Sequence, residues 1–380
     1  MIATKRIEAV DSLRGFAIIS IFLIHSSNHF LYDIQPIYPT QFSWLYEIDQ
    51  ILRNILYFLF EGKAYGIFAV LFGFTFGIQY NKVKKQTDTY QLFFLWRWMI
   101  LASFGLMNAA FFSGGDPLIF MSIVALVLPF IAHLRSKSLI AISIVLFLQP
   151  IELFKGLTQC FNSEITFSNN IAALYKQLEV TTTNGDFLAM VQSNITTGIK
   201  ACLSWAIEYG RASQTLGLYI VGLLLYRNNK FSDITTRFWK RLFIINLIIT
   251  PTLYFISNIT IGIEAMMITL KMWYNLSFTF MWISSFILLY RTFFFNRQSQ
   301  ALQIYGRMSL TNFIFQSIIG TFIFYPYGLN LSTRIGTTGS VVIATLIALS
   351  QIIFSYQWLK RHKYGPFEFI WHRMTYMFFK

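Results

Sequence analysis

The stretch Asp11-Ser-Leu-Arg14-Gly-Phe-Ala-Ile-Ile-Ser-Ile-Phe-Leu-Ile-His25-Ser-Ser-Asn-His29 places charged and titratable side chains on a segment otherwise apolar enough for a bilayer. Each helical residue turns by about 100°, so Arg14 and His25 fall within about 20° of one face, about 16 Å apart along the axis. Asp11 and His29 lie on the same side. Because ionisable groups in a membrane usually face a bundle interior or a wet cavity, we predict that this helix forms one wall of a functional site.

The rest of the chain shares this apolar character. Of its 380 residues, 55% are hydrophobic and 12% are charged, whereas a soluble domain carries roughly 25% charged residues. This composition predicts an all-α, polytopic transmembrane helical bundle, with residues 1–380 forming a single integral membrane domain. Apolar runs near the length of a bilayer crossing predict about ten spans, over residues 12–31, 54–80, 92–112, 117–134, 138–155, 210–226, 241–259, 272–291, 305–326 and 338–359.

The loops between these spans alternate in charge. Lys and Arg cluster after the second, fourth, sixth, eighth and tenth spans, and the intervening loops are poor in both. Positive residues favour the cytoplasmic side, so both termini are predicted to be cytoplasmic. Residues 360–380 are predicted to form a cytoplasmic tail, in which Glu368 pairs with an arginine. The formal net charge of +14 follows the same loop pattern, so we expect no nucleic-acid partner.

The longest predicted loop, residues 156–209, falls on the extracytoplasmic side. Its first part is polar, whereas Phe187–Tyr209 repeats apolar residues at helical spacing. This second part is predicted to be a helix lying on the outer interface. Two roles stay open for the segment: a lid over a substrate, or a plain connector.

Further polar side chains interrupt the apolar spans. Arg97 and Asn108 in the third span repeat the eleven-residue spacing of the first span and share a face. Asp116, in the turn that follows, either caps the next helix or lines a cavity. The ninth span opens with three more polar residues, Arg307, Asn312 and Gln316. Amides in hydrocarbon need partners on other helices, so the two amides serve either as structural glue or as ligand contacts.

The second span carries four glycines on one helix face, namely Gly62, Gly66, Gly73 and Gly77. Small residues at this spacing let two helix backbones approach closely. We therefore predict that another helix packs tightly along this face.

Five segments, taken in order, resemble the YeiB-like family of bacterial membrane proteins, which is defined by a domain of unknown function (DUF418). They are Val10–Ala17, Phe68–Gly73, Gly105–Asp116, Gly306–Asn312 and Gly365–Thr375. The family is similar to the wider superfamily of membrane-bound acyltransferases, in which an Arg-Gly and a His of the first helix serve acyl transfer. Arg14 and His25 stand at those positions. Many YeiB-like sequences have Asn in place of His25, and commonly His in place of Asn108.

The resemblance implies a membrane acyltransferase that moves an acyl group, acetyl among them, from a cytoplasmic acyl-CoA to an extracytoplasmic glycan or lipid acceptor. His25 would act as a general base or as a nucleophile. Arg14, held by Asp11, would bind a phosphate or carboxylate. Because Arg97 and Arg307 lie at the same predicted depth, the three arginines are predicted to surround a coenzyme A phosphate. The alternatives are a structural hydrogen bond for His25 and a headgroup anchor for Arg14.

Two other functions fit the same sequence. One is a transporter of a small anion or lipid, and the other is a non-catalytic envelope protein whose basic tail contacts anionic lipid. In each case we expect membrane lipids as partners and the bacterial cytoplasmic (inner) membrane as the multi-pass location. No His and Cys residues show metal-ligand spacing, so no metal is expected. The sequence carries no signal for the oligomeric state.

Overall fold

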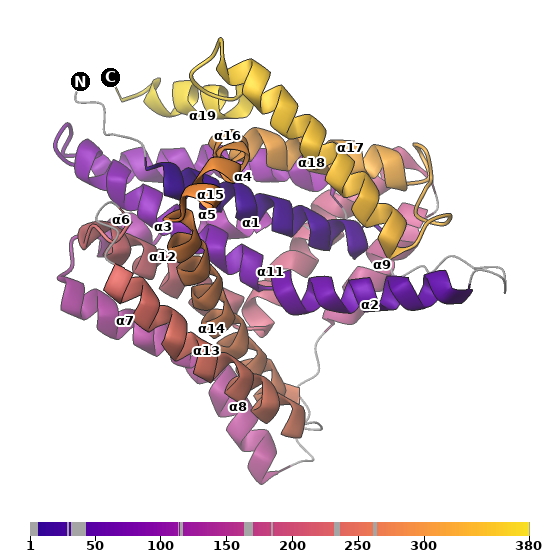
Figure 1. The fold of residues 1–380 in the computed structure, drawn as a ribbon, viewed down its shortest axis with the longest axis horizontal. Helices are drawn as coiled ribbons and strands as arrows, with labels where there is room; N and C mark the ends of the chain where they lie inside the picture. The colour runs from indigo at the N-terminus through magenta and orange to yellow at the C-terminus, as the bar shows by residue number, and fades with distance from the viewer. Residues whose placement is uncertain are drawn as a thin grey trace.

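A computed structural model describes residues 7–28, 30–31, 43–112, 114, 117–162, 170–183, 185–231, 236–260 and 264–379. The regular secondary structure in these ranges is helical, and the helices pack into one bundle (Figure 1). The helices are α1 (Glu8–Ser27), α2 (Ser43–Phe60), α3 (Lys63–Val83), α4 (Tyr90–Phe111), α5 (Pro117–Ala125), α6 (Leu128–Ile131), α7 (Ser136–Leu148), α8 (Pro150–Phe161), α9 (Ile171–Thr183), α10 (Phe187–Ser193), the π-helical η2 (Asn194–Gly198), α11 (Ile199–Glu208), α12 (Arg211–Arg227), α13 (Thr236–Ile259), α14 (Glu264–Tyr290), α15 (Phe293–Gln298), α16 (Gln300–Arg307), α17 (Ser309–Phe324), α18 (Thr337–Leu359) and α19 (Pro366–Tyr376).

Within the described ranges, seven helical stretches are long and apolar enough to cross a membrane. They are Glu8–Ser27, Trp44–Val83, Tyr90–Phe111, Ser136–Phe161, Thr236–Ile259, Ala265–Tyr290 and Thr337–Leu359. Each of the ten predicted ranges contains a helix, but the fourth, sixth and ninth hold shorter ones. Length and composition therefore support a helical membrane bundle with seven such stretches, fewer than the ten predicted spans.

Two of the shorter ranges are interrupted helices. The range 117–134 is split into α5 and α6, and Pro129, at the start of α6, has no N–H with which to continue a helix. The range 305–326 is split into α16 and α17 at Met308. Hydropathy alone merged these pieces because it does not register such breaks.

The first part of α2 is absent from the sequence-based prediction, which began the second span at residue 54. The acidic residues Glu47 and Asp49, in its first half, led to the assignment of that part to a loop. Asp49 is in fact buried, and its Oδ1 accepts the backbone N–H of Thr338 at 2.7 Å. This contact caps the first turn of α18, so the acidic residue has a structural role there.

The glycine face of the second span packs against two helices, and not against one as predicted. A Cβ on Gly73 would overlap the backbone of α12, and one on Gly77 would press on the ring of Tyr226. A Cβ on Gly62 or Gly66 would instead collide with side chains of α14. Close approach along this face therefore anchors α3 between α12 and α14.

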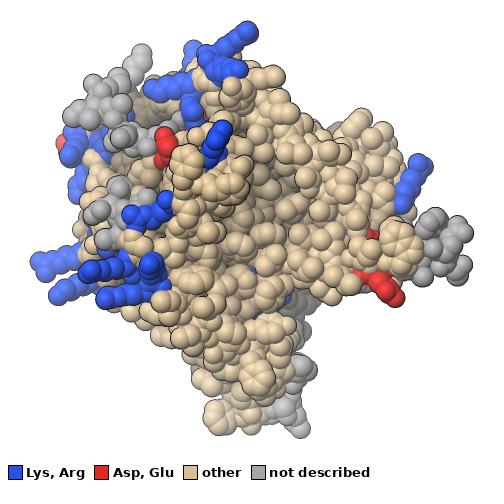
Figure 2. Space-filling model, viewed as in Figure 1, with Lys and Arg blue, Asp and Glu red and all other residues tan. Residues whose placement is uncertain are grey.

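Positively charged side chains are unevenly distributed between the two ends of the bundle. Most Lys and Arg side chains visible in Figure 2 gather at the end where α1 begins and α19 ends. This end is here called the inner end. In the sequence, Lys84 and Lys85 follow α3, Arg237, Lys240 and Arg241 lie on α13, and Lys360, Arg361 and Lys363 follow α18. By the positive-inside rule this is the end predicted to face the cytoplasm. The opposite end is called the outer end.

The segment 156–209 is more helical than predicted. Its first part, expected to be a polar loop, contains the end of α8 and the whole of α9, while residues 163–169 and 184 lie outside the described ranges. Its second part forms α10, η2 and α11. Asn194, fully buried in η2, donates to the carbonyl oxygen of Ala110 at 3.3 Å and so ties this segment to α4. The segment therefore packs onto the bundle at its outer end.

Candidate functional site

One face of α1 runs along two cavities. Arg14 and Ile21 line an inner cavity of about 560 Å³. Ile21 and His25 line an outer cavity of about 600 Å³. The two cavities share Ile21 together with Tyr65 of α3 and Pro117 of α5, so they adjoin at these three side chains. The face predicted from the spacing of Arg14 and His25 thus borders both cavities.

The inner cavity is basic at its inner end and otherwise largely apolar. Its described wall carries one carboxylate, that of Glu368, against five Lys and Arg side chains: Arg14, Lys82, Arg97, Arg307 and Lys363. Aromatic and aliphatic residues line the rest, among them Phe68, Phe72, Trp98, Leu101, Leu118 and Met121. Such a cavity suits a molecule with anionic groups at one end and a less polar chain at the other.

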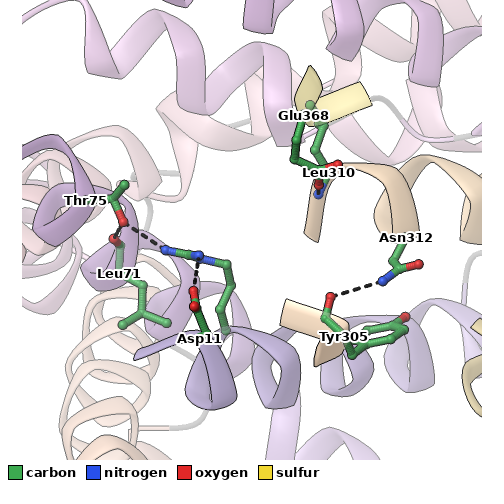
Figure 3. Close-up of polar contacts among 8 residues, drawn as sticks. Asp11, Leu71, Thr75, Tyr305, Leu310, Asn312 and Glu368 are labelled. Atoms are coloured by element: carbon green, nitrogen blue, oxygen red, sulfur yellow. Dashed lines mark hydrogen bonds and ion pairs between the residues drawn. The ribbon is translucent and has the colours of Figure 1, made fainter. Parts of the chain in front are cut away.

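Arg14 is held between α1 and α3. Its Nη1 donates to Oδ1 of Asp11 at 3.0 Å, and its Nη2 donates to Oγ1 of Thr75 at 2.9 Å (Figure 3). The Thr75 hydroxyl donates in turn to the carbonyl oxygen of Leu71 at 2.8 Å. One-turn spacing predicted the contact with Asp11, whereas the contact with Thr75 depends on how the two helices pack. Together these bonds fix the guanidinium at the cavity wall.

A crossing of two glycines brings Arg307 to the same cavity. A Cβ on Gly15 would overlap a carbonyl oxygen of α16, and a Cβ on Gly306 would overlap a carbonyl oxygen of α1. The backbones of α1 and α16 therefore touch at these two positions. Arg14 directly precedes Gly15, and Arg307 directly follows Gly306. Both arginines therefore lie next to the crossing, and both line the inner cavity.

Arg97 reaches the inner cavity from α4 and is held there by α19. Its guanidinium carbon lies 3.8 Å from the ring centroid of Trp371, and Nη1 donates to Oγ1 of Thr375 at 3.3 Å. The Trp371 indole donates to the carbonyl oxygen of Arg97 at 3.1 Å. Arg97 is 7% exposed, and the described part of the chain places no carboxylate within ion-pair distance of it. Its positive charge is therefore available to a bound anion.

Glu368 does not form the arginine pair that we predicted. Its Oε1 accepts the N–H group of Leu310 at 2.7 Å (Figure 3). Oε1 also accepts the N–H of Thr311 at 3.1 Å, and Oε2 accepts the Thr311 hydroxyl at 2.6 Å. The carboxylate thus caps α17, whose own N-cap residue, Met308, makes no side-chain cap bond. Burial raises the pKa of Glu368, although the bonds from Thr311 act in the opposite direction.

His372 lies at the inner cavity beside Tyr364 and Tyr376. Burial lowers its pKa, and the nearby charge of Arg97 adds to that effect. The sequence analysis did not single out His372. The signal that could have identified it is its place in the closing motif Gly365–Thr375, next to Trp371.

His25 lines the outer cavity, one turn beyond the shared Ile21. Its ring centroid lies 4.7 Å from that of Phe112, at the end of α4. Asn108 is fully buried one turn earlier on the same helix and is not part of either cavity wall. Asp116 and His29 lie outside the described residues. Gly114 and Pro117, which flank Asp116, both line the outer cavity.

Asn312 and Gln316 belong to a buried network and do not line either cavity. Asn312 donates to the carbonyl oxygen of Tyr305 at 3.0 Å and to the Ser355 hydroxyl at 3.1 Å. Gln316 donates to the Tyr305 hydroxyl, which donates to Oε1 of Gln351 at 2.8 Å. The network joins α16, α17 and α18, so its geometry favours structural glue over ligand contact.

The fold and these cavities define a helical membrane protein with a basic inner cavity and a second, outer cavity along one helix. Residues 225–378 match the family model described as "Protein of unknown function (DUF418)". The chain is therefore similar to the YeiB-like proteins of this family. No solved structure matches the chain.

Three relatives cover nearly the whole chain. "Uncharacterized protein YxaH" of Bacillus subtilis (strain 168) is 24% identical over 99% of this chain and 96% of its own. "Uncharacterized 39.9 kDa protein in amylase 3'region" of Bacillus acidopullulyticus is 26% identical over 98% of this chain and 94% of its own. "Uncharacterized protein YeiB" of Escherichia coli (strain K12) is 22% identical over 98% of this chain and 96% of its own. The similarity therefore extends well beyond the segment matched by the family model.

Proposed function

We propose that the chain is a membrane acyltransferase, which moves an acyl group from a cytoplasmic acyl-CoA to an extracytoplasmic glycan or lipid acceptor. The observation that carries the proposal is the meeting of two cavities along α1. The inner cavity is basic, and His25 lines the outer cavity one turn beyond the shared Ile21, which is about 6 Å along the helix axis. A donor in one cavity and an acceptor in the other would meet beside this histidine.

The inner cavity suits the donor. Guanidinium groups bind phosphates through charge-assisted hydrogen bonds, and Arg14, Arg97 and Arg307 all line this cavity. The apolar side chains beyond them suit the pantetheine arm and the acyl chain. A linear molecule with its phosphates at the arginines directs its other end toward the junction at Ile21 and Tyr65.

His25 supplies the proton chemistry in this proposal. It takes the proton from the acceptor hydroxyl, whose oxygen then forms an ester bond to the acyl carbon. The carbon–sulfur bond of the thioester breaks, and the sulfur leaves with its electron pair. The proton passes from His25 to that thiolate, so that the enzyme returns to its starting state with free coenzyme A as product.

The test compares envelope lipids and glycans by mass spectrometry. The cells carry the native protein, a deletion, or His25→Ala at equal expression. We expect a mass increment of acyl size from the native protein, which the deletion and His25→Ala both lose and which His362→Ala keeps. His362→Ala is the matched control, because His362 is an exposed histidine beyond α18 and lines neither cavity.

Other results of this comparison would assign a different role to His25 or to the whole protein. An increment that is lost on deletion but kept in His25→Ala would leave the transferase and remove His25 from its chemistry. Identical envelopes in all strains would contradict acyl transfer. In that case, passage of a labelled anion through proteoliposomes without covalent transfer would identify a transporter, for which the two adjoining cavities also offer a path.

A further inference from the structure

The outer cavity contains a buried arginine that lies apart from the predicted site residues. Arg211 begins α12 and is 5% exposed, yet it lines this cavity. Its Nη1 donates to Oε1 of Gln214 at 3.2 Å, whereas its Nε has no hydrogen-bond partner. Of the carboxylates in the described ranges, none lies within ion-pair distance of this guanidinium. Arg211 is therefore a buried charge without a direct counter-ion.

The acidic residues of the same cavity do not neutralise Arg211 directly. Glu61 and Glu179 line the cavity, but neither forms an ion pair with Arg211, and Oε1 of Glu61 accepts a bond from Lys271 at 3.4 Å. A buried, unpaired charge is strongly destabilising unless an opposite charge or hydrogen bonds compensate for it. A bound anion would provide both.

The surroundings of Arg211 are aromatic. Its guanidinium carbon lies 5.0 Å from the ring centroid of Trp205 on α11. Tyr65 and Tyr175 also line the cavity, with their hydroxyls bonded to Thr215 at 2.8 Å and to the Gly114 carbonyl at 3.4 Å. Aromatic rings offer flat apolar faces with polar tips. Such faces complement the apolar faces and hydroxyl edges of a sugar ring.

We propose that the outer cavity binds an acidic sugar, with its phosphate or carboxylate group on Arg211 and its ring against Trp205 and Tyr175. The inference rests on the proposed function in one respect: it makes an acidic glycan the acceptor for transfer beside His25, which lines the same cavity. The binding site itself requires no acyl transfer.

The test measures binding to the purified full-length chain in detergent by isothermal titration calorimetry, with no acyl donor present. The probes are glucuronic acid, glucose 6-phosphate, uncharged glucose and phosphatidylglycerol. We expect the two acidic sugars to bind at least tenfold more tightly than glucose. Arg211→Gln should weaken only the acidic sugars, by about ten- to a hundredfold, because it removes a charge-assisted contact.

Two control sets keep this test decisive. Arg237→Gln removes an exposed arginine on α13, outside both cavities, and should leave every affinity unchanged. If Arg211→Gln fails to fold, the pair Ala172→Glu and Ala172→Gln replaces it, since Ala172 is exposed on α9 and lines the outer cavity. The added carboxylate should weaken binding of the acidic sugars, and the neutral amide should weaken it less.

Equal affinity for glucose and the acidic sugars would overturn the proposal, as would an Arg211→Gln variant with native affinities. Binding of phosphatidylglycerol alone would replace the sugar with a lipid headgroup. Acidic-sugar binding at Arg211 without any acyl transfer in cells would retain this site and refute the proposed function. Acyl transfer in cells without binding of the acidic sugars would retain the proposed function and refute this binding site.

Discussion

Removing the carboxylate of Glu368 should release α19 from the inner cavity. In the folded protein this side chain accepts two backbone N–H groups and one hydroxyl from the first turn of α17. Glu368→Ala leaves those donors without an acceptor in a buried place, at a cost of about 1–3 kcal/mol for each unsatisfied group. Because the Thr311 hydroxyl can rotate, we expect a total loss of about 2–4 kcal/mol. Glu368→Gln keeps one acceptor oxygen and should lose about 1 kcal/mol.

The same contact should make the docking of α19 depend on pH. The pKa of Glu368 in the folded state lies above its ordinary value of 4.5, chiefly because of burial. The docked state therefore binds a proton more tightly than the released state. The associated stabilisation is fully present below pH 4.5 and is lost as the pH rises through the raised pKa. Glu368→Gln should remove this dependence.

Hydrogen–deuterium exchange of the segment containing Leu310 and Thr311 provides the assay, with rates corrected for intrinsic exchange. A loss of 2–4 kcal/mol corresponds to about 30- to 700-fold faster exchange in Glu368→Ala. The native protein and Glu368→Gln are compared across the same pH range, so that contributions from other groups cancel in the difference. Native exchange rates in Glu368→Ala, or an identical pH dependence in the native protein and Glu368→Gln, would refute the reasoning.

Three further predictions concern the inner cavity and the helix crossing beside it. Gly15→Ala and Gly306→Ala should each lower the thermal unfolding temperature in detergent, because overpacking costs about 1–3 kcal/mol; Gly339→Ala, whose Cβ would meet only a side chain, should lower it less. Arg97→Gln should weaken coenzyme A binding about tenfold or more in titration calorimetry, and unchanged affinity would remove Arg97 from the donor site. The pKa of His372 is lowered from 6.5 by burial and then by Arg97, so its contribution to stability should fall as the pH drops below 6.5. His372→Gln should flatten unfolding temperature against pH in that range, and an unchanged slope would contradict this assignment.

The sequence predicted those features that depend on local geometry. The face shared by Arg14 and His25 follows from helical periodicity, and both residues line cavities along α1. The contact between Asp11 and Arg14 follows from one-turn spacing on the same helix. Apolar composition gave the helical membrane class, and runs of charge gave the inner end. Each of these inferences uses neighbours in the chain or sums over it.

The contacts between helices were decided only by the tertiary structure. A helix that is apolar all round has no amphipathic stripe to indicate which side faces a partner. Hence the sequence did not separate Arg97, which reaches the inner cavity, from Asn312, which binds within a buried network. Nor did it reveal that Glu368 caps α17 or that Arg211 lines the outer cavity. Those roles depend on rotations and crossings of helices far apart in the chain, which are set by close backbone packing at small residues.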